Sequence, residues 1–201
     1  MKRSVVLGTK NQDKVAELGH LLKGSGIHVL SLNNFPGQKD VRETGTTFAA
    51  NARLKARFYS KRTGFLTLAD DSGLMVPALN GKPGVYSARF AGPGCTYTDN
   101  CRKLLRLLAA KRGTARRAKF VSVVAIYDKG KCVDVVRGEC AGTITEAAKG
   151  KNGFGYDPVF IPQGSKKTFA EMSPAEKNAV SHRGKALRSA VKLLRGYCAA
   201  A

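Results

Sequence analysis

The chain has 201 residues, and its 35 Lys and Arg against 14 Asp and Glu give a formal net charge of +21. With 43% hydrophobic and 24% charged residues it can bury a core, which excludes wholesale disorder. The longest near-apolar run, residues 120–127, is far shorter than the roughly 20 residues that span a bilayer, which excludes a membrane-spanning protein. The length fits one domain, and we assign all of residues 1–201 to it.

Cysteine usage and the first residues indicate the compartment. The five cysteines are odd in number and show no C-x-x-C spacing, which argues against a disulfide framework and against a cysteine-based zinc site. No signal peptide is recognisable, because only Val5, Val6 and Leu7 are strongly apolar before Lys10. We therefore predict a cytoplasmic protein. The positive charge predicts an anionic partner, which can be a nucleotide, a nucleic acid or a membrane surface.

Hydrophobic periodicity predicts an α/β fold with a mixed sheet, since strands and helices alternate in the first half of the chain and a hairpin opens the second. In chain order the pattern predicts a strand at 4–7, a helix at 11–24, strands at 27–32 and 66–69 around a helix at 46–62, a loop at 78–94, a helix at 98–111, a hairpin of strands 120–127 and 131–138, a short strand at 159–161 and one helix at 175–197. The strand at 66–69 is expected to stop at Asp70.

Three common signatures are absent from the sequence. There is no G-x-x-x-x-G-K-[ST], no complete G-x-G-x-x-G and no H-E-x-x-H. These absences disfavour a P-loop ATPase, a dinucleotide-binding Rossmann enzyme and a zincin.

The turn Gly8-Thr9-Lys10-Asn11, followed by Lys14, lies between a predicted strand and a predicted helix. A helix that starts this way presents unpaired backbone N–H groups and a positive dipole end, which favour a phosphate. Hydroxyl, amide and ammonium groups there complete a phosphate cradle. The alternative is that Thr9 and Asn11 only cap the helix.

Two adjacent carboxylates, Asp70 and Asp71, follow the apolar run at 66–69. Neighbouring carboxylates repel each other, and a Mg²⁺ ion offsets that repulsion because hard cations prefer carboxylate oxygens and bridge to phosphates. A turn held by Asx hydrogen bonds is the alternative.

Two later segments carry further candidates. In Gly153-Phe154-Gly155-Tyr156-Asp157-Pro158, glycines flank aromatic residues, which allows a flat ligand to approach and stack. Core packing in a tight turn is the alternative. Lys177 and the group at 181–185, which includes His182 and Arg183, are expected on neighbouring faces of one helix, where they present several donors together. The alternative is a basic helix that is merely solvated.

As an ordered set, these motifs resemble the house-cleaning nucleoside triphosphate pyrophosphatases that hydrolyse ITP, dITP and XTP, from about residue 4 to residue 195. The matching stretches are Val6–Asn11 with Lys14, Glu43–Gly45, Thr47–Phe48 with Asn51–Ala52, Ala69–Leu74, Pro83–Phe90, Gly153–Pro158, and Glu176–Asn178 with Ser181–Gly184. The resemblance implies an elongated α/β fold with a mixed twisted sheet, two lobes flanking a central cleft, and a homodimer. It also implies Mg²⁺-dependent conversion of a purine nucleoside triphosphate to the monophosphate and pyrophosphate.

The resemblance further assigns roles. Asp71 accepts a proton from the attacking water, and Glu43 and Asp71 hold the metal. His182 and Arg183 donate to the 6-keto oxygen of the base, which leaves them unpaired against adenine. The remaining substrate-binding residues are Thr9, Lys10, Asn11, Gln12, Asp13 and Lys14 for the phosphates, Ser72 and Lys177 to complete that site, and Phe154, Gly155, Tyr156 and Asp157 for the base and sugar.

The sequence departs from the family pattern at one position near the predicted metal site, and two other functions are alternatives to this prediction. Ala50 replaces a Glu that such proteins commonly have before Asn51, which removes an acid near the metal. Eight basic residues and no acid between Arg102 and Lys119 are compatible with nucleic-acid binding, but they are not interleaved with aromatic residues. The second rival is a pyrophosphatase for other modified nucleotides. We expect no specific nucleic-acid partner and no membrane partner.

Overall fold

The structure is a computed structural model that describes the backbone of residues 3–200 and the side chains of residues 4–197. The chain divides into two compact units. Unit 1 comprises the chain up to Asp71, Ser122–Gly138 and the chain from Lys185 onward, and unit 2 comprises Ser72–Val121 and Glu139–Gly184. Within the described residues, no helix is long and apolar enough to cross a membrane.

Six strands form one mixed sheet in the order β2-β1-β3-β4-β5-β6. β1 runs parallel to β2 and to β3, whereas β5 and β6 are antiparallel. The strands are β1 (Arg3–Leu7), β2 (Ile27–Ser31), β3 (Leu66–Met75), β4 (Arg117–Asp128), β5 (Lys131–Ile144) and β6 (Phe160–Pro162), and the α-helices are α1 (Gln12–Leu21), α2 (Phe48–Thr63), α3 (Tyr97–Leu107), α4 (Pro174–Val180) and α5 (His182–Ala200). The predicted α/β class with a mixed sheet is confirmed.

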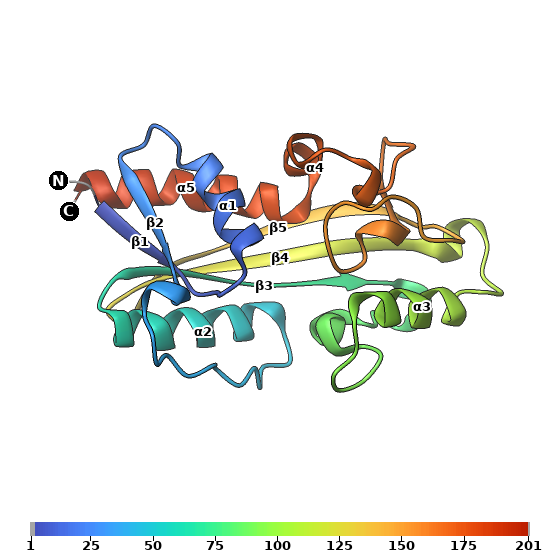
Figure 1. Ribbon diagram of the computed structural model, residues 1–201, viewed down its shortest axis with the longest axis horizontal. Helices are drawn as coiled ribbons and strands as arrows, with labels where there is room; N and C mark the ends of the chain where they lie inside the picture. The colour runs from blue at the N-terminus through green and yellow to red at the C-terminus, as the bar shows by residue number, and fades with distance from the viewer. Residues whose placement is uncertain (1–2, 201) are drawn as a thin grey trace. The chain divides into compact units, whose positions relative to one another are not determined.

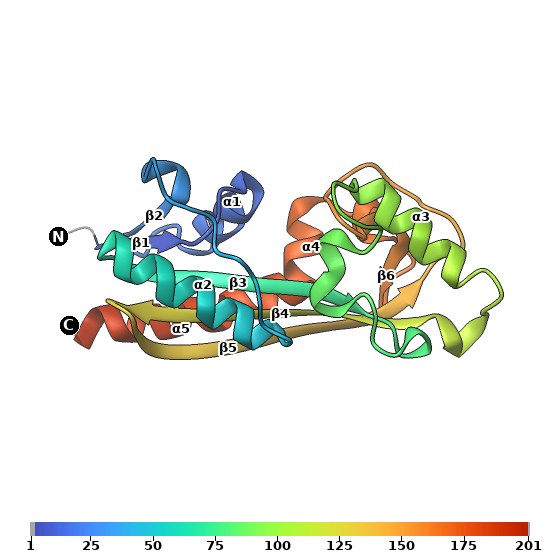
Figure 2. The ribbon, with the colours of Figure 1, turned by 90° about the horizontal axis from the view of Figure 1, so that it is seen from below.

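In unit 1, helices cover both faces of the sheet (Figure 1). Alternate residues of a strand point to opposite faces, and β1 shows this directly. Val5 and Leu7 pack in one cluster with residues of α1 and α5. Val6 packs on the other face with Tyr59 of α2. Figure 2, seen from below, shows α2 running along the sheet. Parallel strands covered on both faces read as continuous apolar runs, which is why 4–7 was recognisable as a strand.

Unit 2 has a core of its own, rich in aromatic side chains. Phe160 and Phe169 are fully buried in it, with ring centroids 5.1 Å apart. The ring of Phe120 packs edge-on against Phe160 at 4.7 Å. Leu104 and Leu108 bring α3 onto the same cluster.

The structure corrects several predicted boundaries. The strand predicted at 131–138 continues to Ile144, and the helix predicted at 98–111 ends at Leu107. β3 does not stop at Asp70 but continues through both aspartates to Met75, and its residue Leu74 is fully buried in the core of unit 2. The predicted helix at 175–197 is two helices, because Ser181 adopts an extended conformation between α4 and α5. The Ser181 hydroxyl accepts a hydrogen bond from the N–H of Gly184 at 3.0 Å, which caps the new helix.

Candidate active site

The turn between β1 and α1 is built as a helix cap. Asn11 accepts a hydrogen bond from the N–H of Lys14 at 3.2 Å, and the Thr9 hydroxyl accepts one from the N–H of Asn11 at 3.1 Å. The alternative role of these two side chains as caps is therefore present in the structure. Gly8 lies against β3, donating its N–H to Leu68 at 2.7 Å, and a Cβ there would press on Tyr59 and Ala69. The start of α1 is thus fixed beside the aspartates.

Lys14 is the residue of this turn that reaches the predicted metal region. Its ammonium donates to both carboxylate oxygens of Asp70, at 2.8 and 2.9 Å, and the pair is largely buried. Lys10 instead pairs with Asp40 at the exposed surface, at 2.9 Å. Gln12 and Asp13 are exposed in the first turn of α1. Of these predicted phosphate residues, Lys14 lies beside the aspartate pair.

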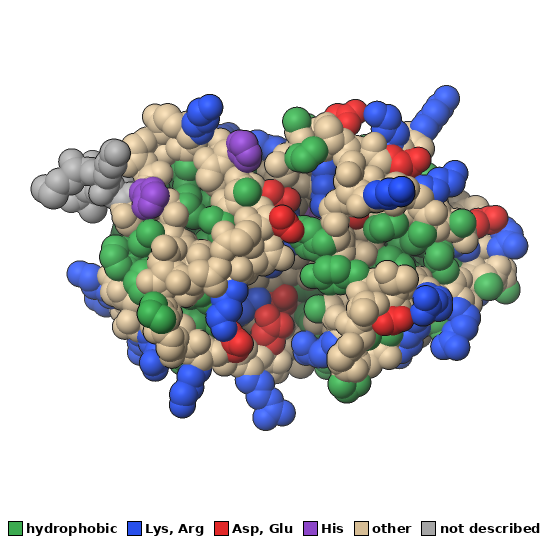
Figure 3. Space-filling model, viewed as in Figure 1, with side chains coloured by type: hydrophobic (Ala, Val, Ile, Leu, Met, Phe, Trp, Pro, Cys, Tyr) green, Lys and Arg blue, Asp and Glu red, His purple; other side chains and the backbone are tan. Residues whose placement is uncertain are grey.

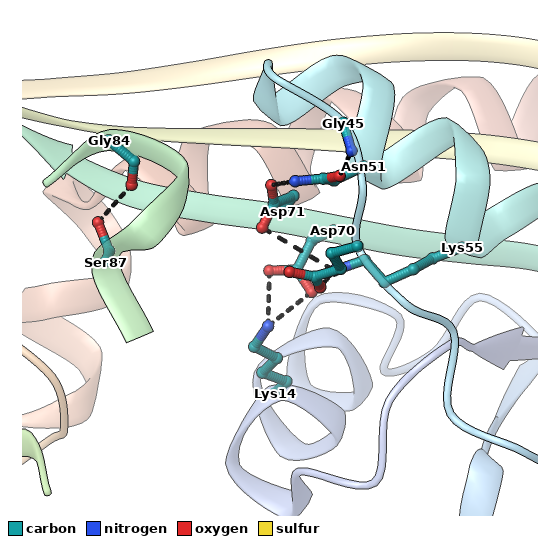
Figure 4. Close-up of polar contacts among 9 residues, drawn as sticks. Lys14, Gly45, Asn51, Lys55, Asp70, Asp71, Gly84 and Ser87 are labelled. Carbon is teal, nitrogen blue, oxygen red and sulfur yellow. Dashed lines mark hydrogen bonds and ion pairs between the residues drawn. The ribbon is translucent and has the colours of Figure 1, made fainter. Parts of the chain in front are cut away.

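Asp71 is reached from α2 by two side chains (Figure 4). Asn51, fully buried, donates from its side-chain amide to the Asp71 carboxylate at 3.0 Å. The Lys55 ammonium lies 3.9 Å from Asp71 and 2.7 Å from the carboxylate of Glu43. The loop that carries Glu43 is tied to the same helix, because the Gly45 N–H donates to Asn51 at 2.7 Å. Glu43 and Asp71 are therefore gathered around one lysine.

Lys55 and Asn51 are site residues to which the sequence analysis gave no role. They stand four residues apart on α2, so they share one face of the helix. That spacing was available as a signal, since two polar residues on the side of a predicted helix that also carries Ala52 and Ala56 are unusual. Their acidic partners come from a loop and from β3, which no local pattern connects.

Burial and charge set the protonation of this cluster. Burial is the largest cause that raises the pKa of Asp71 from 3.8 to about 6, while Lys55 and Asn51 oppose it and Glu43 and Asp70 add to it. Burial lowers the pKa of Lys55, but the carboxylates of Asp70, Asp71 and Glu43 together outweigh burial and raise it. The lysine is thus charged and the aspartate is poised near neutral pH, where a general base works best.

The donor set fits a divalent cation held jointly with a substrate. The described residues include no group of three or more His, Cys, Asp or Glu side chains that could hold an ion by themselves. Mg²⁺, however, is usually bound by one or two carboxylates together with substrate phosphates and water. Glu43 and Asp71 supply two carboxylates of this kind, both in contact with a single ammonium group.

In unit 2, the glycine-rich loop closes on a buried ion pair. Asp157 accepts hydrogen bonds from the Lys177 ammonium at 2.6 Å and from the N–H of Phe154 at 2.8 Å. Gly153 has a φ of +74°, and a Cβ on it would collide with the Asp157 carboxylate. Asp157 is therefore the anchor that holds the loop against α4.

Two cations of unit 2 lie over the ring of Phe154. The Lys177 ammonium lies 4.9 Å and the Arg183 guanidinium 5.0 Å from the centroid of its ring. His182 is buried and stacks on Phe120, with centroids 4.5 Å apart and planes inclined by 6°. The break at Ser181 places Lys177 and Arg183 on different helices, yet both reach the same ring.

Other predicted residues of unit 2 have structural contacts. The Tyr156 ring is buried in the core, and its hydroxyl donates to the Ser87 carbonyl at 2.9 Å. Burial raises the pKa of Tyr156 well above its ordinary range. The Ser87 hydroxyl in turn donates to the Gly84 carbonyl at 2.6 Å (Figure 4). The Cys101 thiol donates a hydrogen bond to the Gly155 carbonyl. Ser72 is half-buried in β3. Any contact of Tyr156 with a ligand is left to its backbone.

Comparison with known proteins identifies the family of the chain. The chain matches the model of the Ham1 family over residues 5–193. Two proteins named dITP/XTP pyrophosphatase are similar to it: one from Desulforamulus reducens, 49% identical over 190 residues and 94% of both chains, and one from Bacillus anthracis, 47% identical over 188 residues, 92% of this chain and 93% of the other.

Solved structures give the same result. A HAM1 protein from Coxiella burnetii superimposes with a TM-score of 0.87 at 40% identity, over 99% of this chain and 100% of the other. A nucleoside-triphosphatase from Mycobacterium abscessus, also named dITP/XTP pyrophosphatase, superimposes with a TM-score of 0.76 at 44% identity. The match covers 92% of this chain and 97% of the other. The chain therefore belongs to the Ham1 family.

Proposed function

We propose that this chain hydrolyses the non-canonical purine nucleotides dITP, ITP and XTP to the monophosphate and pyrophosphate, in the presence of Mg²⁺. The observation that carries the proposal is Asp71, a buried carboxylate with a pKa near 6 that lies beside Glu43 and Lys55. Relatives named dITP/XTP pyrophosphatase, 47–49% identical over more than nine-tenths of both chains, support the same reaction. Unit 1 contains Thr9–Lys14, Glu43 and Asp71, and unit 2 contains Ser72, Lys177 and the residues proposed for the base.

The chemistry at the phosphates follows from the unit 1 cluster. Asp71 accepts a proton from water, the water oxygen forms a new bond to phosphorus, the α–β anhydride bond breaks, and pyrophosphate leaves with the electron pair. Lys14 and Lys55 already stand beside carboxylates and can turn to phosphate oxygens when a triphosphate binds. Glu43 and Asp71 would hold Mg²⁺, which when bound neutralises phosphate charge. Positioning and charge neutralisation are most of what phosphoryl transfer requires.

The base is recognised in unit 2. Phe154 offers a ring for stacking, with its loop fixed by Asp157. His182 and Arg183 would donate to the 6-keto oxygen, and adenine would present an amino group to those donors instead. Donors left unpaired on burial reduce affinity strongly, which rejects ATP.

The contacts of the basic segment between Arg102 and Lys119 argue against nucleic-acid binding as the main function. Arg116 is buried and donates to the carbonyls of Leu108 and Ile144, and Lys103 donates to the carbonyl of Phe90. These cations serve the fold. Figure 3 shows Lys and Arg side chains at several places on the visible face. We accordingly propose that the chain has no specific nucleic-acid partner. A homodimer is proposed from the family resemblance alone, and a cytoplasmic location from the cysteine usage.

Product identification tests the reaction. ITP and XTP are incubated with the purified protein in Mg²⁺ and in EDTA, and the products are separated by ion-exchange chromatography. The proposal expects inosine or xanthosine monophosphate with pyrophosphate in equal amounts, and no turnover in EDTA. Release of the diphosphate with inorganic phosphate would show a different bond being broken. Turnover that persists in EDTA would remove the metal from the proposal.

A further inference from the structure

Tyr97 is a large side chain that unit 2 leaves half exposed beside the ring of Phe154. It is the first residue of α3, and 50% of its surface is accessible. Its ring centroid lies 6.1 Å from that of Phe154, with the two planes inclined by 40°. Phe154 is itself half-buried, so both rings keep part of their surface accessible.

The backbone that carries Tyr97 is held firmly, so its ring is a rigid group on two rotatable bonds. Thr96 and Asp99 form a capping box: the Asp99 N–H donates to the Thr96 hydroxyl at 3.2 Å, and the Thr96 N–H donates to the Asp99 carboxylate at 3.0 Å. A second pair strengthens the first turn, since Arg102 lies 2.9 Å from Asp99. Such a ring contributes contact area at a small cost in conformational entropy.

The other groups around the Phe154 ring are cations, Lys177 at 4.9 Å and Arg183 at 5.0 Å. Tyr97 therefore adds a second π-surface to a place that otherwise offers charge. The two rings are too close to hold a base between them as they stand, because two stacked layers need about 7 Å, twice the usual contact of about 3.5 Å. For a base to enter, the half-exposed Tyr97 side chain would have to rotate about its own torsions.

We propose that Tyr97 is a further substrate-binding residue, whose ring closes over the purine base that stacks on Phe154. The inference rests on the proposed function, since it takes a purine base as the group held at Phe154. Stacking involves the face of the base and not its edge, so it strengthens binding of hypoxanthine and adenine alike. Tyr97 then contributes affinity, and the choice between bases stays with His182 and Arg183.

Equilibrium binding of inosine monophosphate, the product, tests this without turnover. Calorimetric titration of the intact protein compares wild type with Tyr97→Ala, Tyr97→Leu and Tyr97→Phe. We expect the Ala and Leu variants to bind about 5- to 20-fold more weakly and Phe to bind like wild type. Leu107→Ala is the control, since Leu107 is 43% exposed at the far end of α3, about 15 Å along the axis.

Two further measurements, enzyme kinetics and inhibition by a ligand without a base, separate a binding role of Tyr97 from a structural role. Tyr97→Ala should raise the KM for ITP by the same factor while kcat stays within about twofold, and inhibition by inorganic tripolyphosphate, which has no base, should be unchanged. Adenosine monophosphate should lose affinity by the same factor as inosine monophosphate.

Each outcome decides the inference. Inosine monophosphate binding to Tyr97→Ala within twofold of wild type would overturn the role of Tyr97, whatever the enzyme hydrolyses. A wild type that binds the monophosphate and shows the expected loss, but does not cleave ITP, would remove the proposed function and leave Tyr97 as a base-binding residue. A wild type that cleaves ITP but binds no monophosphate would overturn the base-binding role of Tyr97 and leave the proposed reaction standing.

Discussion

Replacing Asp71 with Asn is expected to lower kcat for ITP about 100- to 10 000-fold, the usual contribution of a general base. The amide cannot accept the proton of the attacking water, and raising the Mg²⁺ concentration should not restore the rate. Pyrophosphate release at saturating ITP measures the effect. Asp134→Asn is the matched control, because Asp134 is an exposed acid of unit 1 that lies on β5 and bonds its neighbour Val135. A rate within tenfold of wild type would contradict the role of Asp71.

The same substitution should stabilise the protein at neutral pH in EDTA. The pKa of Asp71 is raised from 3.8 to about 6, chiefly by burial, so its ionised form favours the unfolded chain. The uncharged amide of the Asp71→Asn variant lacks that penalty, which is worth at most about 3 kcal/mol for a shift of this size. The Asn51 amide can still donate to the oxygen of the new side chain.

The sign of the pH dependence follows from the raised pKa. As the pH falls through about 6 towards 4, wild type takes up its proton in the folded state first and gains stability, so its difference from Asp71→Asn shrinks. Below about pH 4 the difference should vanish, because Asp71 is protonated in both states. Urea unfolding of both proteins at pH 8, 6 and 4 gives the comparison. A variant less stable than wild type at pH 8 would refute the burial account.

Asp157→Ala is expected to cost about 3 kcal/mol or more of unfolding free energy, because it leaves the buried Lys177 ammonium without its carboxylate. It also removes the acceptor of the Phe154 N–H, so the KM for ITP should rise. Glu139→Ala is the matched control, since its partner Lys119 is 42% exposed and that pair should contribute less than about 1 kcal/mol.

A double variant shows whether the stability lost in Asp157→Ala comes from the unpaired Lys177 ammonium or from lost packing. Asp157→Ala with Lys177→Met removes both charges and should recover part of the stability lost by Asp157→Ala alone. Urea unfolding of the two single variants and the double variant gives the coupling. If the losses of the single variants simply add, the pair is not coupled, and the assigned role of Asp157 as partner of Lys177 fails.

Local sequence patterns predicted most of the elements of this fold. Apolar runs and helical spacing located the elements, because burial on both faces of the sheet requires those periods. The hairpin of strands 120–127 and 131–138 was predicted, and in its turn Lys129 and Gly130 both have positive φ, as a two-residue turn needs. The patterns failed where the backbone was decided by distant contacts. The aspartate pair resembles a strand end, but burial of Leu74 in unit 2 extends β3 past it.

Two further features of the structure could not be predicted from the sequence, for related reasons. Ser181 lies inside a continuous helical pattern, and only the hydrogen bond from Gly184 reveals it as a cap. Lys55 and Tyr97 contact residues that are far away in the sequence: Lys55 meets Asp71, and Tyr97 meets Phe154 from another element of unit 2. Motifs located the loops that carry candidate site residues, whereas residues that complete a cluster from a helix face required the structure.

The most direct test of the account is the ratio of kcat/KM for ITP to that for ATP, measured by pyrophosphate release with Mg²⁺. The two substrates share their ribose triphosphate and differ only at the 6 position and at N1, which carries a hydrogen in hypoxanthine and none in adenine. The ratio therefore reports on the groups that contact this edge of the base. Loss of paired donors predicts a ratio of about 100 or more in favour of ITP. Equal values for the two nucleotides would contradict the assignment of this chain to deaminated purine nucleotides.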